Sequence, residues 1–89
     1  MDGAYELINR IEKEFGSDVQ FKESVSLYAD DLEVGNGDTY FVGLKEVRNH
    51  IRRAQEQSGC SVKTDGERVE IRHEVGNGLY YVARYRAMW

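Results

Sequence analysis

Two glycine-containing turns in the last thirty residues constrain the fold more than any other feature of the sequence. Asp65-Gly66 and Gly76-Asn-Gly78 favour tight turns, because glycine and asparagine adopt positive φ angles at little cost. They divide residues 60–89 into three segments in which apolar and polar residues alternate. This pattern predicts an antiparallel meander of three strands with one apolar face, which the rest of the chain has to cover.

The alternation also predicts how the three strands pair. We expect a two-residue loop at Asp65-Gly66 and a three-residue loop at residues 76–78. Two residues at the second turn would place Ile71 opposite Arg84, whereas three give each apolar residue of the middle strand an apolar or aromatic partner. The predicted pairs are Cys60 with Ile71, Val62 with Val69, Val75 with Leu79, His73 with Tyr81, Ile71 with Ala83, Val69 with Tyr85 and, on the other face, Glu70 with Arg84.

Two segments have the apolar spacing of amphipathic helices. The first begins after the capping residue Asp2 and ends at Gly16, and the second runs from about Leu44 to Gln57. Each places one apolar stripe toward a core. The stripes comprise Ala4, Ile8, Ile11 and Phe15 in the first segment and Leu44, Val47, Ile51 and Ala54 in the second.

Residues 18–29 fit two patterns. The apolar spacing over residues 21–28 fits a helix, and residues 17–20 have the form of a capping box. The alternation over residues 19–27 fits a strand, which only Glu23 interrupts. We favour the helix because the capping box supports it.

Asn36-Gly37 predicts a hairpin turn between strands at Leu32–Val34 and Thr39–Val42. A two-residue loop would place Leu32 opposite Phe41, and a three-residue loop would place it opposite Tyr40. The pentapeptide at residues 33–37 recurs unchanged at residues 74–78. We interpret the recurrence as one turn chemistry used twice rather than as a structural repeat.

The composition indicates one soluble domain over residues 1–89. No run of 18 apolar residues is present, the N-terminus does not resemble a signal peptide, and Cys60 is the single cysteine. A cytoplasmic location is therefore expected, with no membrane partner. Residues 1–58 hold 12 acidic against 7 basic residues, and the net charge of −4 argues against nucleic acid as a partner.

The segment Leu27-Tyr-Ala-Asp-Asp31, followed by a short strand, a turn, Gly43 and an amphipathic helix, resembles the signature of the NTF2-like (cystatin-like, SnoaL-like) superfamily. Asp65-Gly-Glu-Arg-Val-Glu-Ile71 is similar to the strand that follows the third helix of that family. The resemblance covers about residues 17–75.

The resemblance implies an α+β fold with the order α-α-β-β-α-β-β-β, in which helices pack on a curved antiparallel sheet and enclose a cone-shaped pocket. Members of the family include ketosteroid isomerase, scytalone dehydratase, limonene epoxide hydrolase, polyketide cyclases and many proteins without catalytic activity. This chain is shorter than usual and lacks a further strand after the meander. The position that matches the isomerase's base falls on Asn36 or its neighbour, and an amide cannot accept a proton at neutral pH.

The apolar sheet face carries the candidate site residues. A histidine paired with a tyrosine, His73 with Tyr81, could act as a general acid and base or orient a ligand, although a core histidine satisfied by that hydroxyl is the simpler interpretation. Asp31 is a further, weaker catalytic candidate, because adjacent aspartates in a strand point to opposite faces. The candidate ligand-binding residues are Tyr28, His50, His73, Tyr81, Tyr85 and Trp89.

No spacing of histidines and carboxylates predicts a metal site, and no glycine-rich phosphate loop predicts a cofactor. Three functions fit the sequence. The first is a non-catalytic domain that binds a small apolar or aromatic ligand, or pairs with itself as a homodimer through its sheet. The second is an isomerase, dehydratase or hydrolase. The third is a small acidic interaction protein, an accessory or phage-type inhibitor, that covers a protein partner.

Overall fold

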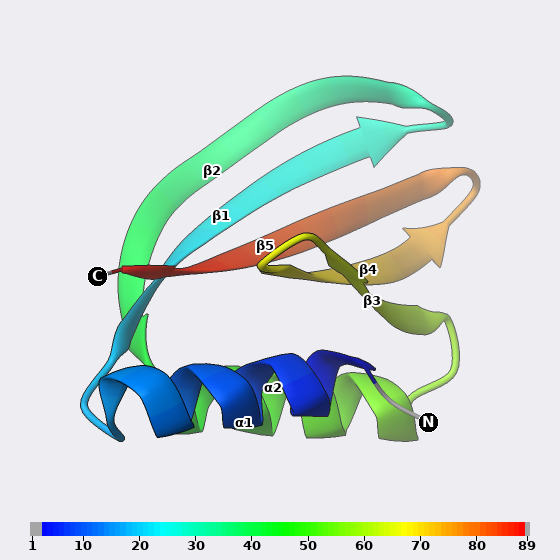
Figure 1. Cartoon of the computed structure of the whole chain (residues 1–89). Helices are drawn as coiled ribbons and strands as arrows, with labels where there is room; N and C mark the ends of the chain where they lie inside the picture. Colours follow the sequence, from blue (N-terminus) through cyan, green and yellow to red (C-terminus); the bar gives the residue numbers. More distant parts are fainter. Residues whose placement is uncertain (1–2, 89) are drawn as a thin grey trace.

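The computed structural model describes residues 3–88, without the side chain of Asp38. Within these residues the chain has an α+β fold, in which two helices pack on one face of a five-stranded antiparallel sheet (Figure 1). The elements are α1 (Gly3–Phe15), β1 (Gln20–Ala29), β2 (Leu32–Gly43), α2 (Leu44–Glu56), β3 (Cys60–Asp65), β4 (Arg68–Gly76) and β5 (Leu79–Met88).

The strands lie in the order β2-β1-β5-β4-β3, so the long pairing of β1 with β5 joins the first hairpin to the C-terminal meander. The helix predicted over residues 18–29 is therefore wrong, because Gln20–Ala29 form strand β1. This strand pairs with β2 on one side and with β5 on the other. Hydrogen bonds to two neighbouring strands outweigh the local capping preference of residues 17–20.

The turn between β1 and β2 also differs from the prediction. The strands reverse at Asp30-Asp31, where Ala29 pairs with Leu32 and Asp30 adopts a φ of 54°. Strand β2 continues through Asn36-Gly37 without turning. Two irregularities in the pairing of β1 with β2 accommodate this segment, and β-bulges of this kind place extra residues in one strand.

The meander is confirmed, and most of its register agrees with the prediction. His73 pairs with Tyr81 as expected, while Gly76 rather than Val75 pairs with Leu79, because an irregularity falls between residues 74 and 76. The turn between β3 and β4 lies one residue later than predicted. Each residue of β3 therefore pairs two residues further along β4 than predicted, for example Val62 with Ile71 and Cys60 with His73. A shift of two residues leaves every side chain on its predicted face.

The core lies between the helices and one face of the sheet, which we call the inner face. The predicted stripes of both helices are buried there, except that Phe15 is 43% exposed at the end of α1. Gly16 ends that helix with a φ of 91°, and its N–H donates to the Glu12 carbonyl. The buried residues of the sheet, and of the segment just before β1, include Val19, Phe21, Val69, Ile71, Ala83, Tyr85 and Ala87.

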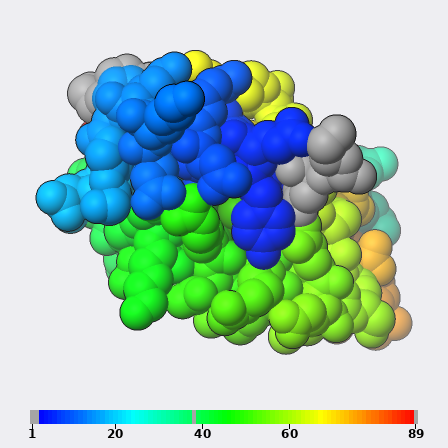
Figure 2. All heavy atoms as spheres, turned by 60° about the horizontal axis from the view of Figure 1, so that its bottom comes forward, coloured from blue at the N-terminus to red at the C-terminus, as the bar shows by residue number. Residues whose placement is uncertain are grey.

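The two helices cover only part of the inner face. They lie side by side, with α1 against β3 (Figure 2), and Arg48 of α2 is joined to Glu12 of α1 by an ion pair of 2.8 Å. Strands β1 and β2 rise away from the helices toward their shared turn (Figure 1). The inner face therefore has a covered part, where Phe21, Ile71 and Tyr85 are buried, and a more open part toward the turns that follow β1 and β4, where Leu27 and Leu79 are exposed.

Candidate functional site

Polar side chains gather on the inner face where the covered part meets the open part. Tyr85 of β5 lies directly opposite Glu23 of β1, and His50 of α2 approaches the same tyrosine from the helix side of the sheet. Further along the sheet, His73 of β4 lies opposite Tyr81 of β5. We call Glu23, His50, His73, Tyr81 and Tyr85 the inner-face cluster.

The helical spacing of α2 explains how His50 reaches this position. Val47 and Ile51 are fully buried in the core, and His50 follows Val47 by one turn, so its side chain lies at the edge of the same stripe. The ring is half-buried and meets the Tyr85 ring edge-on, with ring planes at 87° and centroids 5.6 Å apart.

Tyr85 connects Glu23 to His50 through its hydroxyl group. The hydroxyl donates a hydrogen bond to the Glu23 carboxylate and also contacts His50 Nδ1. Because a hydroxyl has one proton and Glu23 receives it, His50 Nδ1 has to donate to the tyrosine oxygen. Neutral His50 then carries its lone pair on Nε2, which has no hydrogen-bond partner among residues 3–88. This nitrogen is available to accept a proton or a hydrogen bond.

Burial and neighbouring charges keep this arrangement in one protonation state near neutral pH. Burial, followed by the positive charge of Arg53, lowers the pKa of His50 below its usual value of 6.5, although Glu23 opposes the shift. Burial and the hydrogen bond to Glu23 raise the pKa of Tyr85 well above its usual value of 10.0. At pH 7 the histidine is therefore neutral and the tyrosine keeps its proton.

The second histidine–tyrosine pair lies in the more open part of the inner face. His73 Nδ1 and the Tyr81 hydroxyl are 2.7 Å apart, and their rings are 4.9 Å apart. Leu27 lies directly opposite Tyr81, and it is 39% exposed. Leu79, two residues before Tyr81, is 40% exposed on the same face. This pair therefore lies on the same face as two apolar side chains that remain partly exposed.

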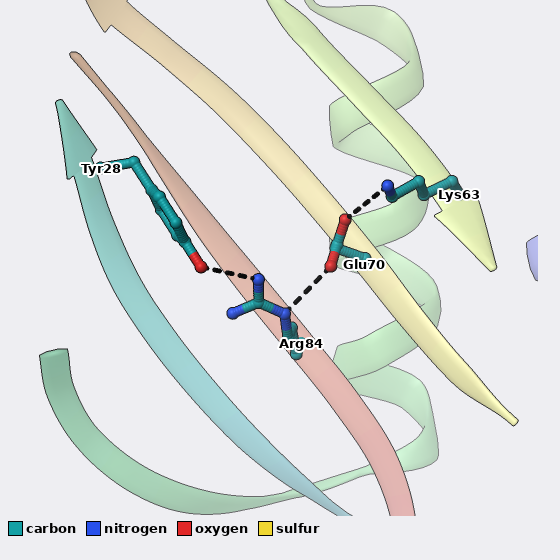
Figure 3. A network of polar contacts seen from close by, with 4 residues as sticks. All are labelled: Tyr28, Lys63, Glu70 and Arg84. Carbon is teal, nitrogen blue, oxygen red and sulfur yellow. Dashed lines mark hydrogen bonds and ion pairs between the residues drawn. The ribbon is translucent and has the colours of Figure 1, made fainter. Parts of the chain in front are cut away.

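The other face of the sheet, which we call the outer face, carries a separate polar network (Figure 3). Arg84 of β5 donates to Glu70 over 3.0 Å and to the Tyr28 hydroxyl over 3.0 Å, while Lys63 pairs with Glu70 over 3.2 Å. The predicted pair of Glu70 with Arg84 is thus confirmed. Beside this network, the Tyr28 and Tyr80 rings are stacked with centroids 5.2 Å apart.

The adjacent aspartates lie in the turn between β1 and β2 and not within a strand. Both line one shallow pocket of about 280 Å³, together with Arg72, Glu74 and Asn77. The expectation that they point to opposite faces is therefore wrong, because a turn does not follow the alternation of a strand. This pocket is distinct from the inner-face cluster.

Four of the predicted ligand-binding residues, His50, His73, Tyr81 and Tyr85, share the inner face. Tyr28 lies on the outer face, and Trp89 is outside the described residues. Sequence reasoning missed Glu23. The sequence contained an indication of it, because Glu23 is the charged residue that interrupts the apolar alternation of residues 19–27. The structure places this position on the inner face.

Within residues 3–88, no group of three or more His, Cys, Asp or Glu side chains is placed to hold a metal ion. The helices of this part of the chain are too short and too polar to cross a membrane. Comparison with models of protein families, with curated proteins and with solved structures found no match to this chain. Its function has to be inferred from its own geometry.

Proposed function

We propose that the protein is a small NTF2-like domain that binds a small ligand on its inner face, and that this ligand has an apolar or aromatic body and a hydroxyl group. The observation that carries the proposal is the free Nε2 acceptor of His50 on the same face as the His73–Tyr81 pair. An apolar surface with a few placed polar groups is typical of ligand sites.

The order of elements supports the NTF2-like part of the proposal. A helix, a strand hairpin, a second helix and a three-stranded meander follow one another, with both helices on one face of an antiparallel sheet. This order differs from the expected one in two places: the second expected helix is strand β1, and the two expected strands at residues 32–34 and 39–42 are the single strand β2. The rise of β1 and β2 away from the helices (Figure 1) is compatible with a cone-shaped site.

The side chains around the cluster indicate the chemistry of the ligand. Leu27, Leu79 and Tyr40 are large apolar or aromatic residues that remain partly exposed on β1, β5 and β2. Tyr40 pairs with Glu23, so it lies on the inner face beside the cluster. These residues would contact the apolar body of the ligand, while His50 would accept a hydrogen bond from its hydroxyl group.

Binding of 2-naphthol, followed by its fluorescence, tests this proposal. We expect saturable binding, weaker binding of 2-methoxynaphthalene, which has no proton to donate, and a loss of about tenfold in affinity for 2-naphthol in His50→Leu. Tyr81→Phe should also weaken binding. Tyr28→Phe is the matched control, because it removes a tyrosine hydroxyl from the outer face. Absence of saturable binding, or equal affinity in His50→Leu, would contradict the proposal.

The connection from Glu23 through Tyr85 to His50 favours a second candidate function, in which the domain catalyses proton transfer. A neutral histidine held in one tautomer by a buried tyrosine and a carboxylate has the features of a general base. Exchange of the α-protons of 2-tetralone in D₂O would detect this activity. It should be lost in His50→Leu and should decline as the pH falls through the pKa of His50, which lies below 6.5. A wild-type rate equal to that of His50→Leu would rule out catalysis by this residue.

The pH dependence of stability tests the environment of His50 without any ligand. Its pKa is lower in the folded state than its usual 6.5, so between these two values the unfolded state binds more protons. The contribution of His50 to stability is therefore complete above pH 6.5 and is lost as the pH falls through the folded pKa. Urea unfolding between pH 5.5 and 7.5 should show this decrease, and His50→Gln should remove most of it. An unchanged slope in His50→Gln would place the titrating group elsewhere.

We further propose that the chain pairs with itself through the edge strand β2. This strand is an edge of the sheet, whose unpaired backbone groups can bond to a second chain, and it carries the large apolar residues Leu32 and Phe41 at 73% and 63% exposure. Light scattering at micromolar concentration should give the mass of a dimer, and Phe41→Lys should give that of a monomer. A monomeric wild-type protein would remove this proposal.

A further inference from the structure

The outer face of the sheet concentrates positive charge, although the chain has a net charge of −4. Four strands, β1, β3, β4 and β5, contribute to it, and their pairing places these residues on one face. Asp65, Glu70 and Glu74 are the acidic residues of these strands on that face. The basic residues are Lys22, Lys63, Arg68, Arg72, Arg84 and Arg86.

Three of these basic residues lie directly opposite one another at one end of the sheet. Arg86 of β5 pairs with Lys22 of β1 on one side and with Arg68 of β4 on the other. Directly opposite residues have Cβ atoms only about 5 Å apart, so like charges in these positions repel each other and destabilise the sheet. All three side chains are exposed.

Asp65 lies opposite Arg68 in the pairing of β3 with β4, but no ion pair joins these two residues, so the repulsion is not compensated by an ion pair within residues 3–88. The Glu70 carboxylate is shared between Lys63 and Arg84, while Lys22, Arg68 and Arg86 make no ion pair within residues 3–88. Lys22, Arg68 and Arg86 line a shallow pocket of about 160 Å³ with Ser24 and Arg84, and no acidic residue is part of its lining. The pocket therefore has hydrogen-bond donors from four cations and a hydroxyl group.

We propose that this pocket binds a phosphoryl group, either free phosphate or a phosphate monoester. Arginine guanidinium groups match phosphate oxygens in bidentate geometry, and Lys22 and Ser24 add further donors. Arg84 is held in place by Glu70 and Tyr28, so this part of the site is formed before an anion arrives (Figure 3). Binding would neutralise the facing charges of Lys22, Arg68 and Arg86.

The neighbouring surface accommodates the organic part of an ester. A second shallow pocket of about 300 Å³ shares Arg84 with the first and is lined by Tyr28, Tyr80 and Val82, among other residues. An aromatic group attached to the phosphoryl group would lie against the partly exposed Tyr28 ring. Comparing the affinities for phenyl phosphate and for inorganic phosphate therefore shows whether the site takes a phosphate monoester or free phosphate.

Titration calorimetry with both anions, at an ionic strength matched with sodium chloride, tests the site. We expect saturable binding, with about tenfold or greater loss of affinity in Arg86→Gln and in Lys22→Gln. Arg52→Gln is the matched control, because it removes the same charge from an exposed position on α2. Tighter binding of phenyl phosphate would identify an ester as the ligand, and equal binding would identify phosphate itself.

Thermal denaturation provides an independent measurement. In chloride buffer Arg86→Gln should melt at a higher temperature than the wild type, because the substitution removes two facing repulsions. In phosphate buffer this advantage should shrink, since bound phosphate stabilises the wild type more than the variant. The proposal would be overturned if neither anion bound more tightly than chloride, or if Arg52→Gln lost as much affinity as Arg86→Gln.

Discussion

The same five residues, Glu-Val-Gly-Asn-Gly, adopt two different structures in this protein. At residues 33–37 they lie inside the continuous strand β2, and neither glycine nor the asparagine has a positive φ. At residues 74–78 they end β4 and form the turn into β5, where Gly76, Asn77 and Gly78 have φ angles of 111°, 54° and 78°.

The difference arises from the strands on either side. Residues 74–78 lie between β4 and β5, which pair with each other, so the chain has to reverse there. Residues 33–37 follow the turn at Asp30-Asp31 and pair with β1 throughout, so a reversal would break that pairing. Asparagine and glycine permit a tight turn without requiring one. In the first copy their flexibility is used for the irregular pairing of β2 with β1.

The largest expected difference between the copies concerns their last glycine. In Gly78→Ala the new Cβ would lie 2.5 Å from Asp30 Oδ1 at a positive φ, so we expect a loss of about 2–3 kcal/mol in the free energy of unfolding. In Gly37→Ala the Cβ would lie 3.5 Å from the Val25 carbonyl oxygen, and the change should stay within about 0.5 kcal/mol. Urea unfolding measures both. Equal losses would mean that both copies are turns.

A smaller difference is expected for the first glycine of each copy. Gly76→Ala meets no atom within 4 Å but has to adopt a φ of 111°, which should cost about 1–2 kcal/mol. Gly35→Ala meets no atom within 4 Å at an ordinary φ, and it should stabilise the protein by about 0.5 kcal/mol by restricting the unfolded chain. The two melting temperatures should therefore move in opposite directions. A decrease in both would contradict the strand conformation of residue 35.

The smallest difference is expected for the asparagines. Asn77 adopts a φ of 54°, which asparagine tolerates better than alanine does, so Asn77→Ala should cost about 0.5–1 kcal/mol. Asn36 lies in an exposed position of β2, and Asn36→Ala should change stability by less than about 0.3 kcal/mol. Chemical denaturation at several protein concentrations would separate these effects from self-association. A larger loss at residue 36 would reverse the assignment of turn and strand.

The inner-face cluster also contains contacts of two kinds, some between residues close in the sequence and some between residues far apart in it. His73 and Tyr81 are eight residues apart on the two strands of one hairpin, so their pairing follows from a turn and an alternation that are visible in the sequence. Tyr85 is 35 residues from His50 and 62 residues from Glu23. These contacts depend on how α2 and β1 are placed against β5, and no local pattern contains that information.

The sequence by itself determined both helices, the three-stranded meander and the pairing of β4 with β5 through most of its length. Each of these depends on periodicity or turn chemistry within a short segment. Only the tertiary structure decided that residues 20–29 are a strand, that the first hairpin turns at Asp30-Asp31, and that Lys22 joins the basic residues of the meander on the outer face. The physical reason is that hydrogen bonds between distant strands can outweigh local preferences, which differ by only about 1 kcal/mol per residue.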